Sequence, residues 1–103
     1  MLDMAQKALE MSAGKDRAAY DEDETLRLAL THIIQIIGEA AQRVTPEFRQ
    51  KYSHVPWQEI IGMRHRIVHD YLNIDEDVIR EVLKQHLPPL AKTLQAILPP
   101  GYN

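Results

Sequence analysis

Apolar side chains recur every three or four residues between positions 23 and 44, and this spacing constrains the fold more than any other feature of the chain. The stripe comprises Leu26, Leu30, Ile33, Ile37, Ala40, Ala41 and Val44. Such a period predicts a long amphipathic helix whose apolar face packs against other elements. Gly38 lies inside it, where glycine costs about 1 kcal/mol relative to alanine. We expect the close approach of another helix to compensate.

Start and stop signals predict further helices and no strand. The expected segments are 2–12, 46–52, 57–71, 76–86 and a last piece ending at Leu98. Thr45 followed by Pro46 is a capping hydroxyl before a first-turn proline. The Leu87-Pro88-Pro89-Leu90 run should break or kink the chain, and Pro99-Pro100-Gly101 should end its order. The pattern predicts an all-α antiparallel bundle of four to five helices in a single domain, residues 1–103.

The long helix is apolar over more than a narrow stripe, because Ile34 and Ile36 widen it. A wide apolar face is often buried on two sides, which favours a homodimer. The other interpretation is that one domain core covers the whole face. The sequence leaves both open, and we favour the dimer.

Composition excludes several classes of protein. The chain has no cysteine, which excludes disulfides and thiolate metal sites. No apolar run approaches the length of about 18 residues that a membrane span needs, and no signal peptide is visible, so we expect a cytoplasmic protein. A net charge of -3 argues against a general nucleic-acid binder, although the sum hides any local basic patch. The acidic runs 21–24 and 75–77 are typical of helix starts.

Residues 64–71 hold the side chains best suited to chemistry. Within eight positions they contain Arg64, His65, His69 and Tyr71. Arginine binds phosphate through a rigid fork of donors, and the unperturbed pKa of histidine suits proton transfer near neutrality. However, Arg64 and His69 lie about 140° apart around an ideal helix. On spacing alone, a solvated basic helix face is the stronger interpretation.

A metal site in this segment is disfavoured. His65 and His69 are four residues apart and share a helix face, as two metal ligands would. No third ligand is evident, and the neighbouring Arg64 and Arg66 would repel a cation. We therefore expect no metal and no other cofactor. Arg66 and Asp70 should form an ordinary ion pair on the helix surface.

Several short motifs together resemble the HepT-like branch of the HEPN superfamily. In order they are Ile36-Ile37-Gly38-Glu39-Ala40-Ala41, Pro56-Trp57, Ile60-Ile61-Gly62-Met63-Arg64, Arg66-Ile67-Val68-His69-Asp70-Tyr71 and Leu87-Pro88-Pro89-Leu90. Each motif is weak alone, but the ordered set covers nearly the whole chain and is specific. The resemblance implies a helical-bundle toxin of a type II toxin–antitoxin system. Such toxins are homodimeric, metal-independent ribonucleases, and a minimal nucleotidyltransferase of the MNT type is their antitoxin.

By resemblance, Arg64 and His69 are the catalytic pair of an Arg-x4-His-x-Tyr motif, and Tyr71 is its tyrosine. His65 occupies the supporting polar position, where asparagine is commoner in this branch. The partner transferase can attach AMP to the motif tyrosine, which implies Tyr71 here. The substrate implied is RNA, with tRNA among the candidate classes. The first helix is short for the branch.

Two functions follow for the chain. The favoured one is an RNA-cleaving toxin in which the RNA 2'-hydroxyl is the nucleophile, with no membrane partner. The alternative is a catalytically silent helical module that binds a nucleotide or a nucleotidyltransferase. The intact Arg64, His69 and Tyr71 favour the first, and the acidic net charge favours the second.

Overall fold

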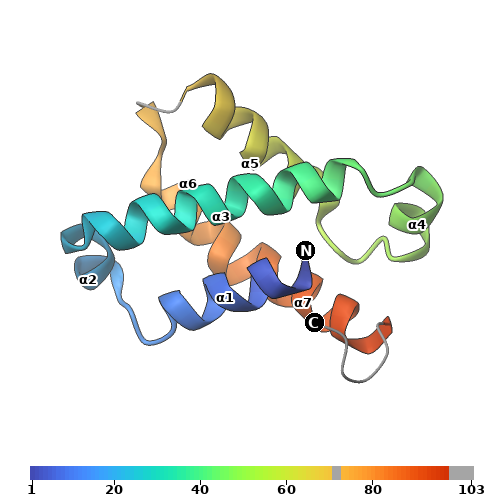
Figure 1. Cartoon of the computed structure of the whole chain (residues 1–103), viewed down its shortest axis with the longest axis horizontal. Helices are drawn as coiled ribbons and strands as arrows, with labels where there is room; N and C mark the ends of the chain where they lie inside the picture. Colours follow the sequence, from blue (N-terminus) through green and yellow to red (C-terminus); the bar gives the residue numbers. More distant parts are fainter. Residues whose placement is uncertain (71–72, 98–103) are drawn as a thin grey trace.

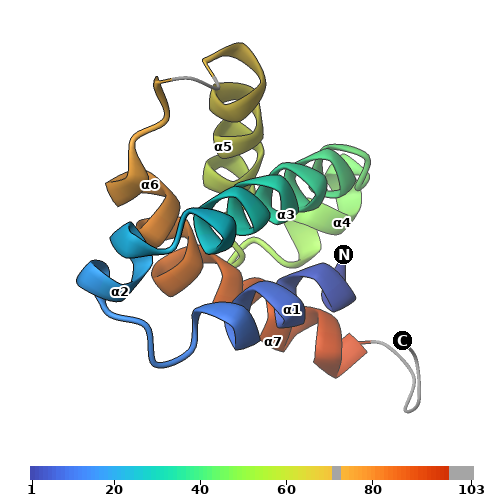
Figure 2. The same ribbon diagram turned by 60° about the vertical axis from the view of Figure 1, so that its left-hand side comes forward.

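Helix α3, Glu24–Gln42, lies at the centre of the fold. The computed structural model describes residues 1–70 and 73–97. Helix α5, Trp57–His69, crosses α3 on one side, while α1, Leu2–Ser12, and α7, Leu87–Ile97, pack on the other (Figures 1 and 2). The described residues contain helices and no strand, which confirms the all-α prediction. They also confirm the long central helix to within two residues at each end.

Side-chain caps set the starts of several helices as the sequence predicts. Asp23 accepts a hydrogen bond from the Leu26 amide at 2.9 Å and begins α3. Thr45 accepts one from the Phe48 amide at 3.1 Å and begins α4, Pro46–Lys51. These bonds satisfy amide groups that have no partner inside their own helix.

The short helix α2, Arg17–Glu22, is absent from the helices predicted above, and Asp16 caps it. The acidic run 21–24 therefore ends one helix and begins the next. The buried Tyr20 fixes α2 in place, because its hydroxyl donates a 2.6 Å hydrogen bond to Glu76 at the start of α6, Glu76–Glu81. Burial, and then this carboxylate, raise the pKa of Tyr20 well above its usual value. The phenol therefore remains a donor at neutral pH.

Leu87-Pro88-Pro89-Leu90 was predicted to break or kink the chain, and the structure shows no break at this run. A π-helical turn, Val82–His86, joins α6 to α7. At its end the Leu87 amide donates to the carbonyl of Val82, five residues back. Pro88 and Pro89 then occupy the first turn of α7, where a missing amide hydrogen costs least. The segment 76–97 is one irregular helical rod, and with α1, α3 and α5 it makes four main helices. Leu98 and Pro99-Pro100-Gly101 lie outside the described residues.

Helix α5 ends at His69, two residues earlier than predicted. Asp70 leaves the helical conformation with φ -142° and ψ 49°. Its carbonyl accepts from the Asn73 amide and its carboxylate accepts from the Asn73 side chain, both at 3.0 Å. Such local bonds offer the backbone an alternative to the helix.

The core of one chain covers most of the broad apolar face of α3. Ile34 is fully buried and Ile36 is half-buried. Trp57 also packs in the core and donates from its ring nitrogen to the Tyr52 carbonyl. The breadth of the α3 face therefore does not by itself require a second chain.

Gly38 is the point of closest approach between α3 and α5. A Cβ at this position would overlap the Cβ of Arg64 and lie 3.1 Å from the Ile60 carbonyl oxygen. The close helix contact predicted for Gly38 is confirmed, and the opposing side chain is a candidate site residue. The crossing of the two helices therefore places Arg64 directly opposite Gly38 and in contact with α3.

Gly38→Ala should destabilise the protein by about 1–3 kcal/mol, as overpacking of a tight contact does. Gly62 is the matched control, because a Cβ there meets nothing within 4 Å. Gly62→Ala should instead stabilise by about 1 kcal/mol through helix propensity. Denaturant unfolding followed by circular dichroism measures both variants. Equal effects of the two would refute the close-packing role of Gly38.

Candidate active site at the end of helix α5

The candidate site residues Arg64, His65 and His69 lie on the last two turns of α5. This end of the helix projects past α3, on the side away from α1 and α7 (Figures 1 and 2). His65 and His69 are exposed and Arg64 is half-buried. Tyr71 lies outside the described residues. The predicted basic cluster is therefore on an accessible part of the fold.

Arg64 lies against α3 and is partly withdrawn from solvent. Its side chain is 24% exposed, and Nη2 lies 3.7 Å from Glu39 Oε1. Its Nε is buried and has no hydrogen-bond partner in the described part of the chain. A buried donor without a partner carries a free-energy cost that a bound anion can remove. Glu39 is not among the site residues predicted above, although it directly follows Gly38.

His65 and His69 form a pair on the outer surface of α5. Their ring centroids are 6.3 Å apart and the ring planes differ by 15°. The four-residue spacing places one ring above the other on the helix. Val68, next to His69, is 44% exposed, and Leu28 on α3 is the other exposed large apolar side chain among the described residues. The face therefore combines two proton-transfer groups with an uncovered apolar one.

Arg64 and His69 do not converge within one chain. The helix is unbroken between them, so the ideal separation of about 140° around its axis holds. Among the described residues no hydrogen bond or ion pair joins the two. Arg64 faces α3, whereas His69 faces outward. One chain supplies both groups but not a single pocket that contains them.

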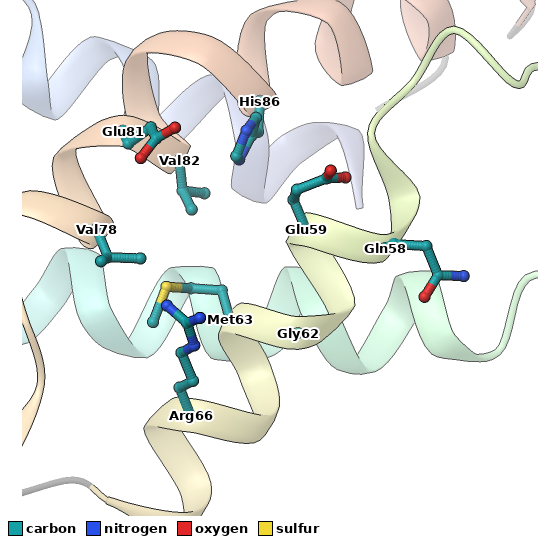
Figure 3. A pocket seen from close by; sticks show the side chains of 9 residues that line it. All are labelled: Gln58, Glu59, Gly62, Met63, Arg66, Val78, Glu81, Val82 and His86. Carbon is teal, nitrogen blue, oxygen red and sulfur yellow. The ribbon is translucent and has the colours of Figure 1, made fainter.

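The prediction that Arg66 and Asp70 form an ion pair is wrong. Asp70 bonds to Asn73 instead, and Arg66 lines a cavity of about 400 Å³ between α5 and the α6–α7 rod (Figure 3). The early end of α5 explains the difference, because Asp70 no longer has the helical position that would place it beside Arg66. No local pattern in the sequence predicts this cavity.

The described residues contain neither a cluster of metal ligands nor a helix that could span a membrane. Across residues 1–70 and 73–97, no three His, Asp or Glu side chains lie close enough together to hold a metal ion. None of the helices in this described portion is long and apolar enough to cross a bilayer.

The chain is similar to several named ribonucleases. It is 38% identical over 79 residues to "Putative RNase TTE0752" of Caldanaerobacter subterraneus, covering 77% of this chain and 70% of that protein. It is 28% identical over 97 residues to "Putative RNase MJ1380" of Methanocaldococcus jannaschii, covering 94% and 89%. It is 29% identical over 68 residues to "Probable ribonuclease HepT" of Thermococcus cleftensis, covering 66% and 62%. No solved structure gives a significant match.

A family model described as ribonuclease HepT-like matches residues 1–97, which is nearly all of the chain. The motifs behind the predicted resemblance fall within this match. The same range includes the crossing of α3 and α5 and the candidate site at the end of α5. The protein therefore belongs to the HepT-like ribonuclease family, within the HEPN superfamily.

Proposed function

We propose that the protein is a metal-independent endoribonuclease and the toxin of a type II toxin–antitoxin pair. The observation that carries the proposal is the exposed His65–His69 pair on the projecting end of α5, which directly follows the half-buried Arg64 in the sequence. Membership of the HepT-like family supports the ribonuclease activity. The antitoxin in this proposal is an MNT-type nucleotidyltransferase.

The reaction uses the RNA's own 2'-hydroxyl as the nucleophile. His69 removes its proton while the 2'-oxygen attacks phosphorus, and a second protonated histidine gives a proton to the departing 5'-oxygen. The guanidinium of Arg64 stabilises the charge that grows on the phosphorane oxygens. One P–O bond forms and one breaks, which leaves a 2',3'-cyclic phosphate and a 5'-hydroxyl. His65, stacked on His69, is a local candidate for the second histidine.

A homodimer would complete the site. Because Arg64 and His69 diverge around α5, an arginine from one chain and a histidine from the other can face the same phosphate. The exposed Val68 beside His69 supports a contact on this face, since the other large apolar side chains in the described part of the chain, Leu28 apart, are covered at least in part. RNA bound in such a shared cleft would also supply an acceptor for the unpartnered Arg64 Nε.

The second candidate is a silent module that binds a nucleotide or a transferase. The net charge of -3 favours it, because RNA backbones attract basic surfaces. Total RNA incubated with the purified wild type separates the two functions. Cleavage that His69→Ala abolishes supports the enzyme, and RNA left intact by folded protein supports the module.

Arg64→Ala and His69→Ala should each lower the cleavage rate by about 10²–10⁴-fold, the range for loss of charge stabilisation or of a general acid–base group. Arg17→Ala and His32→Ala are matched controls on exposed residues of α2 and α3, and should retain the wild-type rate. Gel analysis of labelled RNA measures the rate, with circular dichroism as the folding control. Wild-type activity should persist in EDTA. Its complete loss there would contradict metal independence.

Light scattering at micromolar concentration should give a mass twice that of the 11.9 kDa chain. A sharper test mixes purified Arg64→Ala with purified His69→Ala. If the two chains share one cleft, exchange produces mixed dimers with an intact Arg64 and an intact His69, and part of the activity returns. A monomeric mass, with no recovery on mixing, would rule out the shared cleft.

Co-expression with a cognate nucleotidyltransferase should place AMP on Tyr71, as detected by mass spectrometry. The added phosphodiester would compete with RNA for arginine, since arginine–phosphate pairing is strong. Tyr71→Phe should therefore keep RNA cleavage and escape neutralisation. Tyr52→Phe is the control, because Tyr52 is half-buried at the end of α4. Complete neutralisation of a toxin whose Tyr71 carries no AMP would leave steric blocking by the partner as the explanation.

A further inference from the structure

The cavity between α5 and the α6–α7 rod has the size of a small-molecule site. Its volume is about 400 Å³, within the range of about 300–1,000 Å³ that is usual for ligand pockets. Its apolar wall is made by Met63 from α5 together with Val78 and Val82 from the rod (Figure 3). These side chains can cover the face of a flat ring.

Polar groups face the same space from both walls. In Figure 3 the Arg66 guanidinium and the His86 ring point toward each other across the cavity. Glu81 lies beside His86 on the same wall, and Glu59 lines the opposite wall with its carboxylate turned outward. One guanidinium with a carboxylate suits a neutral ligand that both accepts and donates hydrogen bonds. It suits neither a bare anion nor a bare cation, because each would meet a like charge.

His86 supplies a second observation. It ends the π-helical turn Val82–His86, and such turns are frequent at functional sites. Its Nδ1 is buried and has no hydrogen-bond partner among the described residues. A buried polar atom in a native protein is normally paired, so a ligand atom is a natural partner here.

We propose that this cavity is a nucleobase subsite that selects guanine in the RNA substrate. Guanine presents O6 and N7 as a pair of acceptors, which an arginine fork contacts bidentately. Its N1–H and 2-amino groups are donors that a carboxylate accepts. Arg66 on α5 would hold the first edge and Glu81 on the opposite wall the second, with Val82 and Met63 against the ring. Unpaired RNA bases are commonly read in this way.

The position of the cavity connects this subsite to the proposed cleavage. Arg66 and His69 are three residues apart on α5, so their Cβ atoms are neighbours about 5–6 Å apart on the helix surface. A base seated beside Arg66 would therefore leave its ribose and phosphate within reach of His69. This inference rests on the proposed ribonuclease function for its biological meaning, but the binding itself can be measured separately.

The test titrates ¹⁵N-labelled protein with GMP, AMP, CMP and UMP and follows the amide and arginine side-chain signals. GMP should produce saturable shifts at Gly62 and Arg66 at concentrations about tenfold lower than the other three, the discrimination that one bidentate contact gives. Arg66→Lys keeps the charge but removes the fork, and Glu81→Gln keeps the shape but removes the charge. Both should lose the GMP preference. Lys84→Ala, an exposed change in the same π turn, should keep it.

His69→Ala separates this inference from the proposed function. That variant should lose RNA cleavage and keep the preference for GMP over the other three nucleotides, because His69 is near the phosphate and not the base. In the wild type, cleavage of a random-sequence RNA should occur next to guanine, and Arg66→Lys should cut without this preference. GMP-selective binding by a protein that cleaves no RNA would refute the ribonuclease and retain the subsite. Equal shifts with all four nucleotides, or no saturable shift near the cavity, would overturn the subsite.

Discussion

The contact between Gly38 and Arg64 is the constraint on which the rest of the site depends. Without a side chain on Gly38, α5 packs so closely on α3 that the backbone carbonyl of Ile60 would lie 3.1 Å from an added Cβ. The same approach draws the stem of Arg64 under α3 and brings its guanidinium to Glu39. A glycine that is unfavourable for helix formation therefore positions the most important cation of the candidate site.

Partial burial changes what Arg64 can do. A guanidinium on an exposed helix face is well hydrated and loses rotamer freedom on binding a phosphate. Here the side chain is already held, 24% exposed, against α3. Its buried, unpartnered Nε leaves hydrogen-bonding capacity unused in the described part of the chain. Both features favour an anion that arrives from outside, which fits the chemistry proposed for an RNA phosphate.

Helix α5 presents two groups of candidate functional side chains on different parts of its surface. The histidine pair is displayed on the face beside the exposed Val68, while Arg66 turns toward the cavity next to the π-helical turn. In our proposals the first face performs proton transfer at a dimer contact and the second holds a base. A single helix serves both because its neighbouring side chains point in directions about 100° apart.

The sequence by itself determined the helices and the chemical groups. The three- and four-residue apolar period defined α3, and the hydroxyl or carboxylate caps at Asp23 and Thr45 fixed helix starts. The order of short motifs identified the family and pointed to Arg64, His65 and His69. These signals are local, because caps and helical periodicity act between residues a few positions apart.

Tertiary structure decided which of these groups meet. Short α2 escaped prediction because its position depends on a hydrogen bond from Tyr20 to Glu76, 56 residues away. The approach of Glu39 to Arg64 and the cavity around Arg66 and His86 arise from the packing of separate helices. Periodicity shows which face of a helix is apolar but not which element covers it or at what distance. Those quantities are set by side-chain packing across the core, which no local pattern records.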